Sequence, residues 1–293
     1  MRLGINVANF GPATGPEAFD RWAVLGEDLG FDLLAMSDHV LVTPDVAADY
    51  PAPFYDALTT LAYLAGTTSR IRLGTTVLVL PYRHPLLVAR VAATLDQLSR
   101  GRLVLGVGAG WAAREFATLG FDHARRGPVT DEHLRILLDA WTTPVLSDGT
   151  ATGPAPAQRP RPPVWVGGGG DGRAGMRRTI RFGATWHPLH PSLADVRDRH
   201  LPELRRLAEA AGAPVPAVAP RLALRLLDGA APGGDDRPLG TGTLDQVRGD
   251  VEALGRLGIE DVMLDPYVVG PDGPDHDAAA RQVEQVGVAL LSR

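Results

Sequence analysis

A histidine and an aspartate stand where a buried strand is expected to end. The segment 33–38 is apolar up to Ser37, and Asp38 and His39 follow. At the carboxyl end of a parallel strand, a histidine can face a ligand and donate a hydrogen bond or a proton. The same ring can instead satisfy a carbonyl group of the following loop. Position alone leaves both roles open for His39.

Two glycine runs follow other apolar segments. Gly106 to Gly110 reads GVGAG, and Gly167 to Gly170 ends a short strand just before a helix. Glycine lets a flat ligand approach the backbone, and free amide groups at a helix start suit a phosphate. The second run is equally consistent with a flexible turn. Neither run has the G-x-G-x-x-G spacing of a dinucleotide fingerprint.

Trp186, His187 and Pro188 end a further strand. The tryptophan either lines a site for a ring-shaped ligand or fills the core. His187 and His190 are three residues apart, but no carboxylate lies nearby in the sequence and Pro188 breaks any helical register. We therefore predict no metal site. The remaining histidines are expected at the surface or on helices: His84, His123, His133, His200 and His276.

Strand and helix patterns alternate along the whole chain. Apolar strand-like segments are predicted at 3–9, 33–38, 72–80, 103–107, 164–167, 184–188, 219–227 and 261–265. Helical spacing is predicted at 17–29, 56–67, 85–99, 130–141, 172–181, 193–211, 244–257 and 278–291. Eight such pairs in 293 residues predict a single (β/α)8 TIM barrel domain over residues 1–293. An open doubly wound sheet is the structural alternative.

Three connections are long, at 37–55, 143–163 and 228–243. Long connections in a compact domain are often lids or mobile excursions. The first and third follow strands, so they lie on the carboxyl-terminal face and are expected to cover a ligand. The second follows a helix and is expected to begin on the opposite face.

Composition excludes several classes of function. The net charge of −5 is spread along the chain, without a basic stripe for nucleic acid. The absence of cysteine excludes disulfides, thiolate metal sites and cysteine nucleophiles. No apolar run reaches the ~18 residues of a membrane span. The start of the chain lacks the apolar block of a signal peptide, so we expect a cytoplasmic protein.

Six motifs, in this order, resemble the bacterial luciferase-like superfamily. They read SDH, RIRLGTTVLVLPYRHP, GRLVLGVGAGW, PPVWVGGGG, ATWHP and GTLDQVRGDVEALGRLGIEDVMLDP. The resemblance is closest to the branch that uses the deazaflavin coenzyme F420. Members that use FMN share most of these motifs.

The resemblance implies roles for the residues around the cofactor ring. His39 matches the active-site histidine beside the deazaflavin ring, and Asp38 is expected to orient it. Thr76 and Val77 match a site where F420-dependent relatives keep a non-proline cis peptide. The resulting bulge backs the ring and bends it, so that hydride transfer uses one face.

Further residues are implied to bind the cofactor. Gly108, Ala109 and Gly110 would lie along the ring and ribityl chain, Trp186 would line the ring site, and the phosphate would be held by Gly167, Gly168 and Gly169. Arg114 would either attract the anionic tail of F420 or pair with an acid on the helix surface.

One departure from the family bears on the substrate. Some F420-dependent sugar-phosphate dehydrogenases carry a glutamate acid where this chain has Trp111, and an asparagine where it has Arg114. Tryptophan cannot donate a proton in that way, so sugar phosphates are not expected and the general acid is His39 or comes from the substrate. The expected pocket walls are mainly apolar and favour a hydrophobic or aromatic substrate: Phe10, Leu41, Tyr82, Trp111 and Trp186.

These observations predict an F420-dependent oxidoreductase that transfers a hydride between the deazaflavin and a small apolar substrate. One alternative is an FMN-dependent two-component monooxygenase. Another is a cofactor-binding protein without turnover. The family implies a homodimer or higher oligomer, and a flavin or F420 reductase as the source of reduced cofactor. No nucleic-acid or membrane partner is expected.

Overall fold

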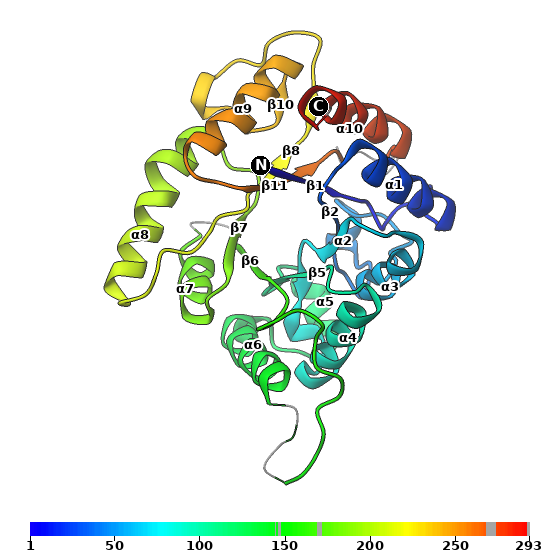
Figure 1. Cartoon of the computed structure of the whole chain (residues 1–293), viewed down its shortest axis with the longest axis vertical. Coiled ribbons are helices and arrows are strands. Elements are labelled where there is room, and N and C mark those ends of the chain that lie inside the picture. Colours follow the sequence, from blue (N-terminus) through cyan, green and yellow to red (C-terminus); the bar gives the residue numbers. More distant parts are fainter. Residues whose placement is uncertain (144, 146–147, 169–171, 268–273, 292–293) are drawn as a thin grey trace.

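Parallel β-strands form a ring at the centre of the molecule, and helices surround it (Figure 1). The computed structural model describes residues 1–143, 145, 148–168, 172–267 and 274–291. Within these ranges the strands of the ring follow the order β7-β6-β5-β3-β2-β1-β11-β8, with β4 beside β5. Their bounds are β1 Arg2–Asn6, β2 Leu33–Met36, β3 Arg72–Thr75, β4 Leu78–Val79, β5 Leu103–Gly108, β6 Val164–Gly168, β7 Thr185–Pro188, β8 Arg221–Ala223 and β11 Asp261–Asp265.

The ring closes between its first and last strands. Single parallel bridges join Trp186 to Val218 and Leu189 to Arg221. The backbone N–H of His190 also donates to the carbonyl oxygen of Arg221 at 2.7 Å. An open doubly wound sheet would leave β7 and β8 far apart, so these contacts confirm the predicted (β/α)8 barrel.

The strands are joined by helices, which cover the outside of the barrel except for two short ones, at 44–47 and 113–118, in the connections after β2 and β5. The helices are α1 Pro16–Leu29, α2 Pro44–Ala47, α3 Ala57–Thr67, α4 Pro85–Leu98, α5 Ala113–Thr118, α6 Arg126–Thr142, α7 Arg173–Phe182, α8 Leu201–Ala210, α9 Leu244–Arg256 and α10 His276–Leu291. Local signals fix several starts. Proline opens α1 and α4, the Asp56 carboxylate caps α3 by accepting from the Thr59 N–H, and Thr243 with Gln246 forms a capping box on α9.

Two of the predicted strands do not run through the barrel as single strands. The segment 72–80 divides into β3 and β4 around Thr76–Val77, whose peptide bond is cis. The segment 219–227 leaves the barrel after β8. It continues as β9, Arg225–Leu226, which pairs only with β10, Thr241–Gly242, in a separate parallel pair.

The long connection 228–243, expected to cover a ligand, is anchored to α9. The buried Asp250 carboxylate on this helix accepts from the Arg237 guanidinium at 2.5 Å and from the Gly240 N–H at 2.9 Å. These bonds hold the connection against the outer helix. Within the described ranges, no helix is both long and apolar enough to cross a membrane.

Apolar side chains pack on both sides of the ring. A small cluster fills the barrel interior, with residues from neighbouring strands and from the segment just before β8: Leu33, Ala35, Val104, Trp165, Ala219 and Met263. The intervening side chains, such as Leu34 and Met36, join the larger cluster between strands and helices. This packing fixes the carboxyl ends of the strands, where the predicted site residues lie.

Candidate active site

A histidine–carboxylate pair lies beyond the end of β2. The Nδ1 atom of His39 is 2.6 Å from Oε2 of Glu115, a fully buried residue on α5. The other carboxylate oxygen, Oε1, accepts from the backbone N–H groups of Val40 and Leu41 at 2.6 and 3.0 Å. Tyr82 donates its hydroxyl to Oε2 at 3.0 Å. Glu115 thus ties the segment after β2 to α5.

The surroundings of Glu115 favour its ionised form. Burial alone raises the pKa of the carboxyl group, but the hydrogen bonds from His39, Leu41 and Val40 outweigh it, and the pKa lies below its ordinary value. Burial and the adjacent carboxylate raise the pKa of Tyr82, so its hydroxyl stays protonated and donates. An ionised carboxylate only accepts hydrogen bonds. Nδ1 of His39 lies within hydrogen-bond distance of this carboxylate.

Asp38 has a different role from the one predicted. Its carboxylate accepts from both terminal nitrogens of Arg83, at 2.7 and 2.8 Å, and from the Val79 N–H at 2.9 Å. The carboxylate that bonds the His39 ring is therefore that of Glu115, and not that of Asp38 as expected.

Glu115 was not singled out from the sequence, although a signal exists. Ala112, Glu115, Phe116 and Leu119 recur at helical spacing, and all four are buried or half-buried. An acidic residue on the apolar face of a short helix requires a buried partner. The sequence alone does not say which residue that partner is.

Aromatic side chains surround the His39 ring. Ring centroids of Tyr50, Phe54 and Trp111 lie 5.3, 5.4 and 5.7 Å from it, and Phe10 packs on Tyr50 at 5.0 Å. Trp111 is 48% exposed. Phe10 and Trp111 were predicted as pocket walls, whereas Tyr50 and Phe54 belong to the 37–55 connection and were missed. We call Phe10, Tyr50, Phe54 and Trp111 the aromatic cluster.

Two other residues that were predicted to line the pocket donate hydrogen bonds to the Glu115 carboxylate. Tyr82 is buried with its hydroxyl on Glu115 and its ring against Phe116, with centroids 4.7 Å apart. Leu41 reaches Glu115 through its backbone N–H, and its side chain is half-buried. These two residues stand behind the histidine–carboxylate pair.

A second histidine holds the segment between β3 and β4. Thr76 Oγ1 lies 2.8 Å from Nε2 of His187, whose Nδ1 bonds the carbonyl of Ala219. Burial lowers the pKa of His187 to about 4, so the ring is neutral at physiological pH. With Nδ1–H donating to a carbonyl, Nε2 accepts from the Thr76 hydroxyl.

A buried ion pair holds the same segment from below. Arg221 donates to the Thr76 carbonyl at 2.7 Å and pairs with Asp265 at 2.6 Å. Asn6 and His190 also bond the Asp265 carboxylate, at 3.0 and 3.2 Å. Burial would raise the pKa of Asp265, but Arg221 outweighs it and the pKa falls well below its ordinary value. His187 thus bonds Thr76 and Ala219, and His190 bonds Asp265.

The glycines of β5 and β6 are required by packing against Val77. A Cβ at Gly108 would lie 2.6 Å from Val77 Cγ2, and one at Gly167 would lie 3.1 Å from Val77 Cγ1. At Gly110, with φ +78°, a Cβ would lie 2.7 Å from Val79. Packing of Val77 and Val79 therefore favours glycine at these positions, in addition to the close approach of a ligand that the sequence predicts.

Gly168, the last described residue before Gly169 in the expected phosphate turn, lies against Trp186. This side chain is only 1% exposed, and a Cβ at Gly168 would lie 2.8 Å from its Nε1. That N–H has no hydrogen-bond partner among the described residues. Gly172, with φ +73°, precedes α7, and a Cβ there would lie 3.0 Å from the same ring. Gly169 lies outside the described residues, so its predicted role stays a prediction.

The last two predicted binding residues lie close to the aromatic cluster in the chain. Ala109 is half-buried, and Arg114 is exposed on α5 with its backbone N–H 3.4 Å from an Asp45 carboxylate oxygen. The exposed side chain of Arg114 is compatible with both predicted roles, attraction of the anionic F420 tail and pairing with an acid on the helix surface.

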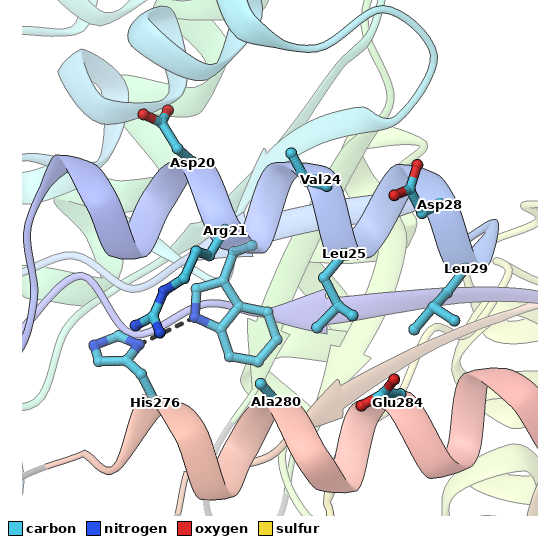
Figure 2. A pocket seen from close by; sticks show the side chains of 10 residues that line it. Asp20, Arg21, Val24, Leu25, Asp28, Leu29, His276, Ala280 and Glu284 are labelled. Atoms are coloured by element: carbon cyan, nitrogen blue, oxygen red, sulfur yellow. Dashed lines mark hydrogen bonds between the residues drawn. The ribbon is translucent and has the colours of Figure 1, made fainter.

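A groove of about 600 Å³ lies outside the barrel, between α1 and α10 (Figure 2). At one end the buried His276 accepts from the Trp22 indole N–H at 3.0 Å, and its Nε2 lies 2.9 Å from Thr14 Oγ1. His276 was expected at the surface or on a helix, and it is the first residue of α10, with its side chain buried. The residues that line the groove do not include His39, Thr76 or Gly167.

The fold places the chain among the (β/α)8 barrel proteins. Within that class, residues 1–227 match the profile of the family described as luciferase-like monooxygenase. The match covers well over half of the chain, so the protein belongs to this family. The resemblance predicted from the motifs is confirmed.

Relatives within reach of sequence comparison include both F420-dependent and flavin-dependent enzymes. An F420-dependent glucose-6-phosphate dehydrogenase of Kribbella flavida is 36% identical over 177 residues, covering 55% of this chain and 52% of that protein. The oxygenase component of a flavin-dependent trigonelline monooxygenase from Acinetobacter baylyi is 33% identical over 125 residues, covering 40% and 34%. The chain thus spans about half the length, or less, of these relatives.

A solved structure confirms the fold over the full length. The monooxygenase RslO1 from Streptomyces bottropensis superposes with a TM-score of 0.77 at 24% identity, covering 99% of both chains. Together the comparisons support a luciferase-like oxidoreductase or monooxygenase whose cofactor is F420 or a flavin.

Proposed function

We propose that the protein is an F420-dependent oxidoreductase that transfers a hydride between the deazaflavin and a small, apolar organic substrate. The observation that carries the proposal is the His39–Glu115 pair beneath the aromatic cluster. Nδ1 of His39 is committed to Glu115, and no described residue bonds to Nε2. Nε2 is therefore the ring atom that exchanges a proton with a substrate.

The residues present fit the cofactor. When bound, F420 supplies a ring carbon that accepts or donates a hydride. The buried N–H of Trp186, which has no partner among the described residues, and the amide groups at the start of α7 are hydrogen-bond donors of the kind that hold a phosphate. Gly167 and Gly168 would hold the phosphate above them. Val77, fixed between β5 and β6, would back the ring.

The chain's own groups divide the remaining work. His39 holds or releases a proton at Nε2, and Glu115 keeps its other nitrogen occupied. The aromatic cluster binds an apolar substrate and excludes water. The half-exposed Trp111 offers no carboxylate at this position, which disfavours a sugar phosphate even though a relative is named for one.

The FMN-dependent two-component monooxygenase is the second candidate. It is favoured by the identity to the trigonelline monooxygenase component, which implies a separate reductase as partner. The third alternative, a binding protein without turnover, is disfavoured by the buried and ionised Glu115 that serves His39. Three further statements stay predictions. The chain is expected to be one domain, to act in the cytoplasm as a homodimer or larger oligomer, and to bind no nucleic acid.

Fluorescence titration of the purified protein tests the cofactor. F420 and FMN are each added in oxidised and reduced form. The proposal expects tighter binding of F420, with Gly168→Ala weakening it because the added methyl lies against Trp186. Tighter binding of reduced FMN than of either form of F420 would contradict the proposal and favour the monooxygenase.

A further inference from the structure

We propose that Glu115 is the positioning residue that keeps the reactive nitrogen of His39 at Nε2. The proposal rests on the proposed function, because the chemical consequence concerns proton exchange during hydride transfer. Glu115 lies on α5, 76 residues further along the chain than His39. Neither the family motifs nor the sequence pattern assigned it a role.

Glu115 acts through the histidine because its own oxygens are fully occupied. Oε1 accepts two backbone N–H groups, from Val40 and Leu41, and Oε2 receives His39 and Tyr82. The side chain is 0% exposed. A carboxylate with four donors and no exposed surface has no contact left for a substrate.

This arrangement selects one tautomer of neutral His39. A histidine that donates from Nδ1 to a carboxylate leaves Nε2 as an acceptor, and the same carboxylate stabilises the charged ring once Nε2 gains a proton. Alternate tautomers would place two lone pairs, on Nδ1 and on Oε2, only 2.6 Å apart. The geometry thus excludes Nε2–H in the neutral ring.

The other titratable groups near the ring do not compete for Nδ1. Asp38, the neighbour in sequence, is committed to Arg83. Tyr82 donates to Glu115 rather than to His39. Burial raises the pKa of Tyr50, which packs on the His39 ring, so its hydroxyl stays protonated.

The consequence for the reaction is that Nε2 is the one ring atom of His39 that exchanges a proton with the substrate. With F420 bound, oxidation of a substrate alcohol would break its carbon–hydrogen bond, and the cofactor would accept the hydride. The hydroxyl proton passes to Nε2 of His39, and the carbon–oxygen double bond forms. The charged ring then lies against the Glu115 anion. Reduction of a carbonyl substrate uses the same atoms in reverse.

Glu115→Gln is the sharpest variant. Glutamine keeps the volume, and its amide oxygen can still accept from Val40 and Leu41. Its amide nitrogen then faces Nδ1 of His39 and donates to it, so the neutral ring must carry its hydrogen on Nε2. Tyr82→Phe is the matched control, because it removes one donor from the same oxygen and keeps the charge.

Nitrogen NMR of His39 gives the readout without any cofactor. The signals are recorded at alkaline pH, where the ring is neutral, and assigned by their loss in His39→Ala. We expect Nδ1–H in the wild type and in Tyr82→Phe, and Nε2–H in Glu115→Gln. A wild-type ring that carries its hydrogen on Nε2 overturns the proposal, even if the glutamine variant fails to fold.

Turnover gives the second readout. Glu115→Gln is expected to lose roughly 100-fold or more in turnover with little change in cofactor affinity, since general acid–base catalysis is worth about that much. Tyr82→Phe is expected to lose less than about tenfold, as befits one neutral hydrogen bond. Wild-type turnover in Glu115→Gln would overturn the proposal. Failure of F420 to bind would count against the proposed function alone, because the tautomer is measured without it.

Discussion

Two histidines at the mouth of the barrel show how a partner decides a role. His39, after β2, bonds an ionised carboxylate through one nitrogen and leaves the other without a bond to any described residue. His187, in β7, uses both nitrogens on neutral groups, the Thr76 hydroxyl and the Ala219 carbonyl. Both rings are buried. The charge and number of partners therefore distinguish His39, which we propose exchanges a proton, from His187, which holds the segment between β3 and β4.

The largest effects are expected from replacing each of these two histidines, His39 and His187. We expect His39→Ala to reduce turnover by roughly 10²–10⁴-fold, because the group that exchanges the proton is lost. Cofactor affinity, measured by fluorescence titration, is expected to change little. His187→Gln is the paired control, for which unfolding free energy and not turnover is expected to carry the main loss. A larger effect of His39→Ala on affinity than on turnover would make it a binding residue.

The Arg221–Asp265 ion pair beneath Thr76 tests whether the segment that His187 contacts has a structural role. Asp265→Asn is expected to lower the free energy of unfolding by roughly 3–5 kcal/mol, because it leaves the buried Arg221 charge without its partner. Urea unfolding followed by circular dichroism measures the loss. In the double variant with Arg221→Met, part of the stability should return. A single variant as stable as the wild type would show that the pair does not hold the segment.

The pH dependence of stability isolates His187. Its pKa is about 4 in the folded protein against an ordinary 6.5, so the unfolded chain binds more protons between these values. The contribution is fully present above pH 6.5 and is lost as pH falls towards 4. We expect the wild type to lose roughly 3 kcal/mol more than His187→Gln across this window. Equal losses in urea titrations of the two proteins would refute the assignment of a neutral, buried ring.

A smaller effect is expected at the phosphate turn. Gly168→Ala places a methyl group 2.8 Å from Trp186 Nε1, where backbone and ring must shift. We expect a stability loss of about 1–3 kcal/mol and weaker cofactor binding. Gly120→Ala, whose added methyl meets no atom within 4 Å, controls for the loss of a glycine, although its φ of +79° adds local strain. Unchanged cofactor affinity in Gly168→Ala would separate this turn from the cofactor.

The sequence predicts the elements of this barrel better than the partners within its site. Segment 261–265 is found as β11 with the predicted bounds, because a short apolar run flanked by a helix and a turn is a local signal. The division of 72–80 around Thr76 is not local, since it depends on Arg221 and His187 from distant strands.

The candidate site shows the same contrast between local sequence signals and contacts from distant parts of the chain. His39 was predicted from its place after β2 and from the family motif, whereas its partner was assigned to the adjacent Asp38. The actual partner, Glu115, is 76 residues away, and only the closed barrel brings α5 to the end of β2. Tyr50 and Phe54 were missed because nothing in the irregular 37–55 connection reveals which side chains turn inward.

Anaerobic reaction with reduced cofactor tests the central claim most directly. Reduced F420 is mixed with the protein and a panel of apolar enones, imines and ketones, and cofactor absorbance and product are followed in parallel with His39→Ala. The account predicts oxidation of F420 without oxygen, one product molecule per cofactor, and loss of this reaction in the variant. Turnover that appears only with reduced FMN and oxygen would contradict it.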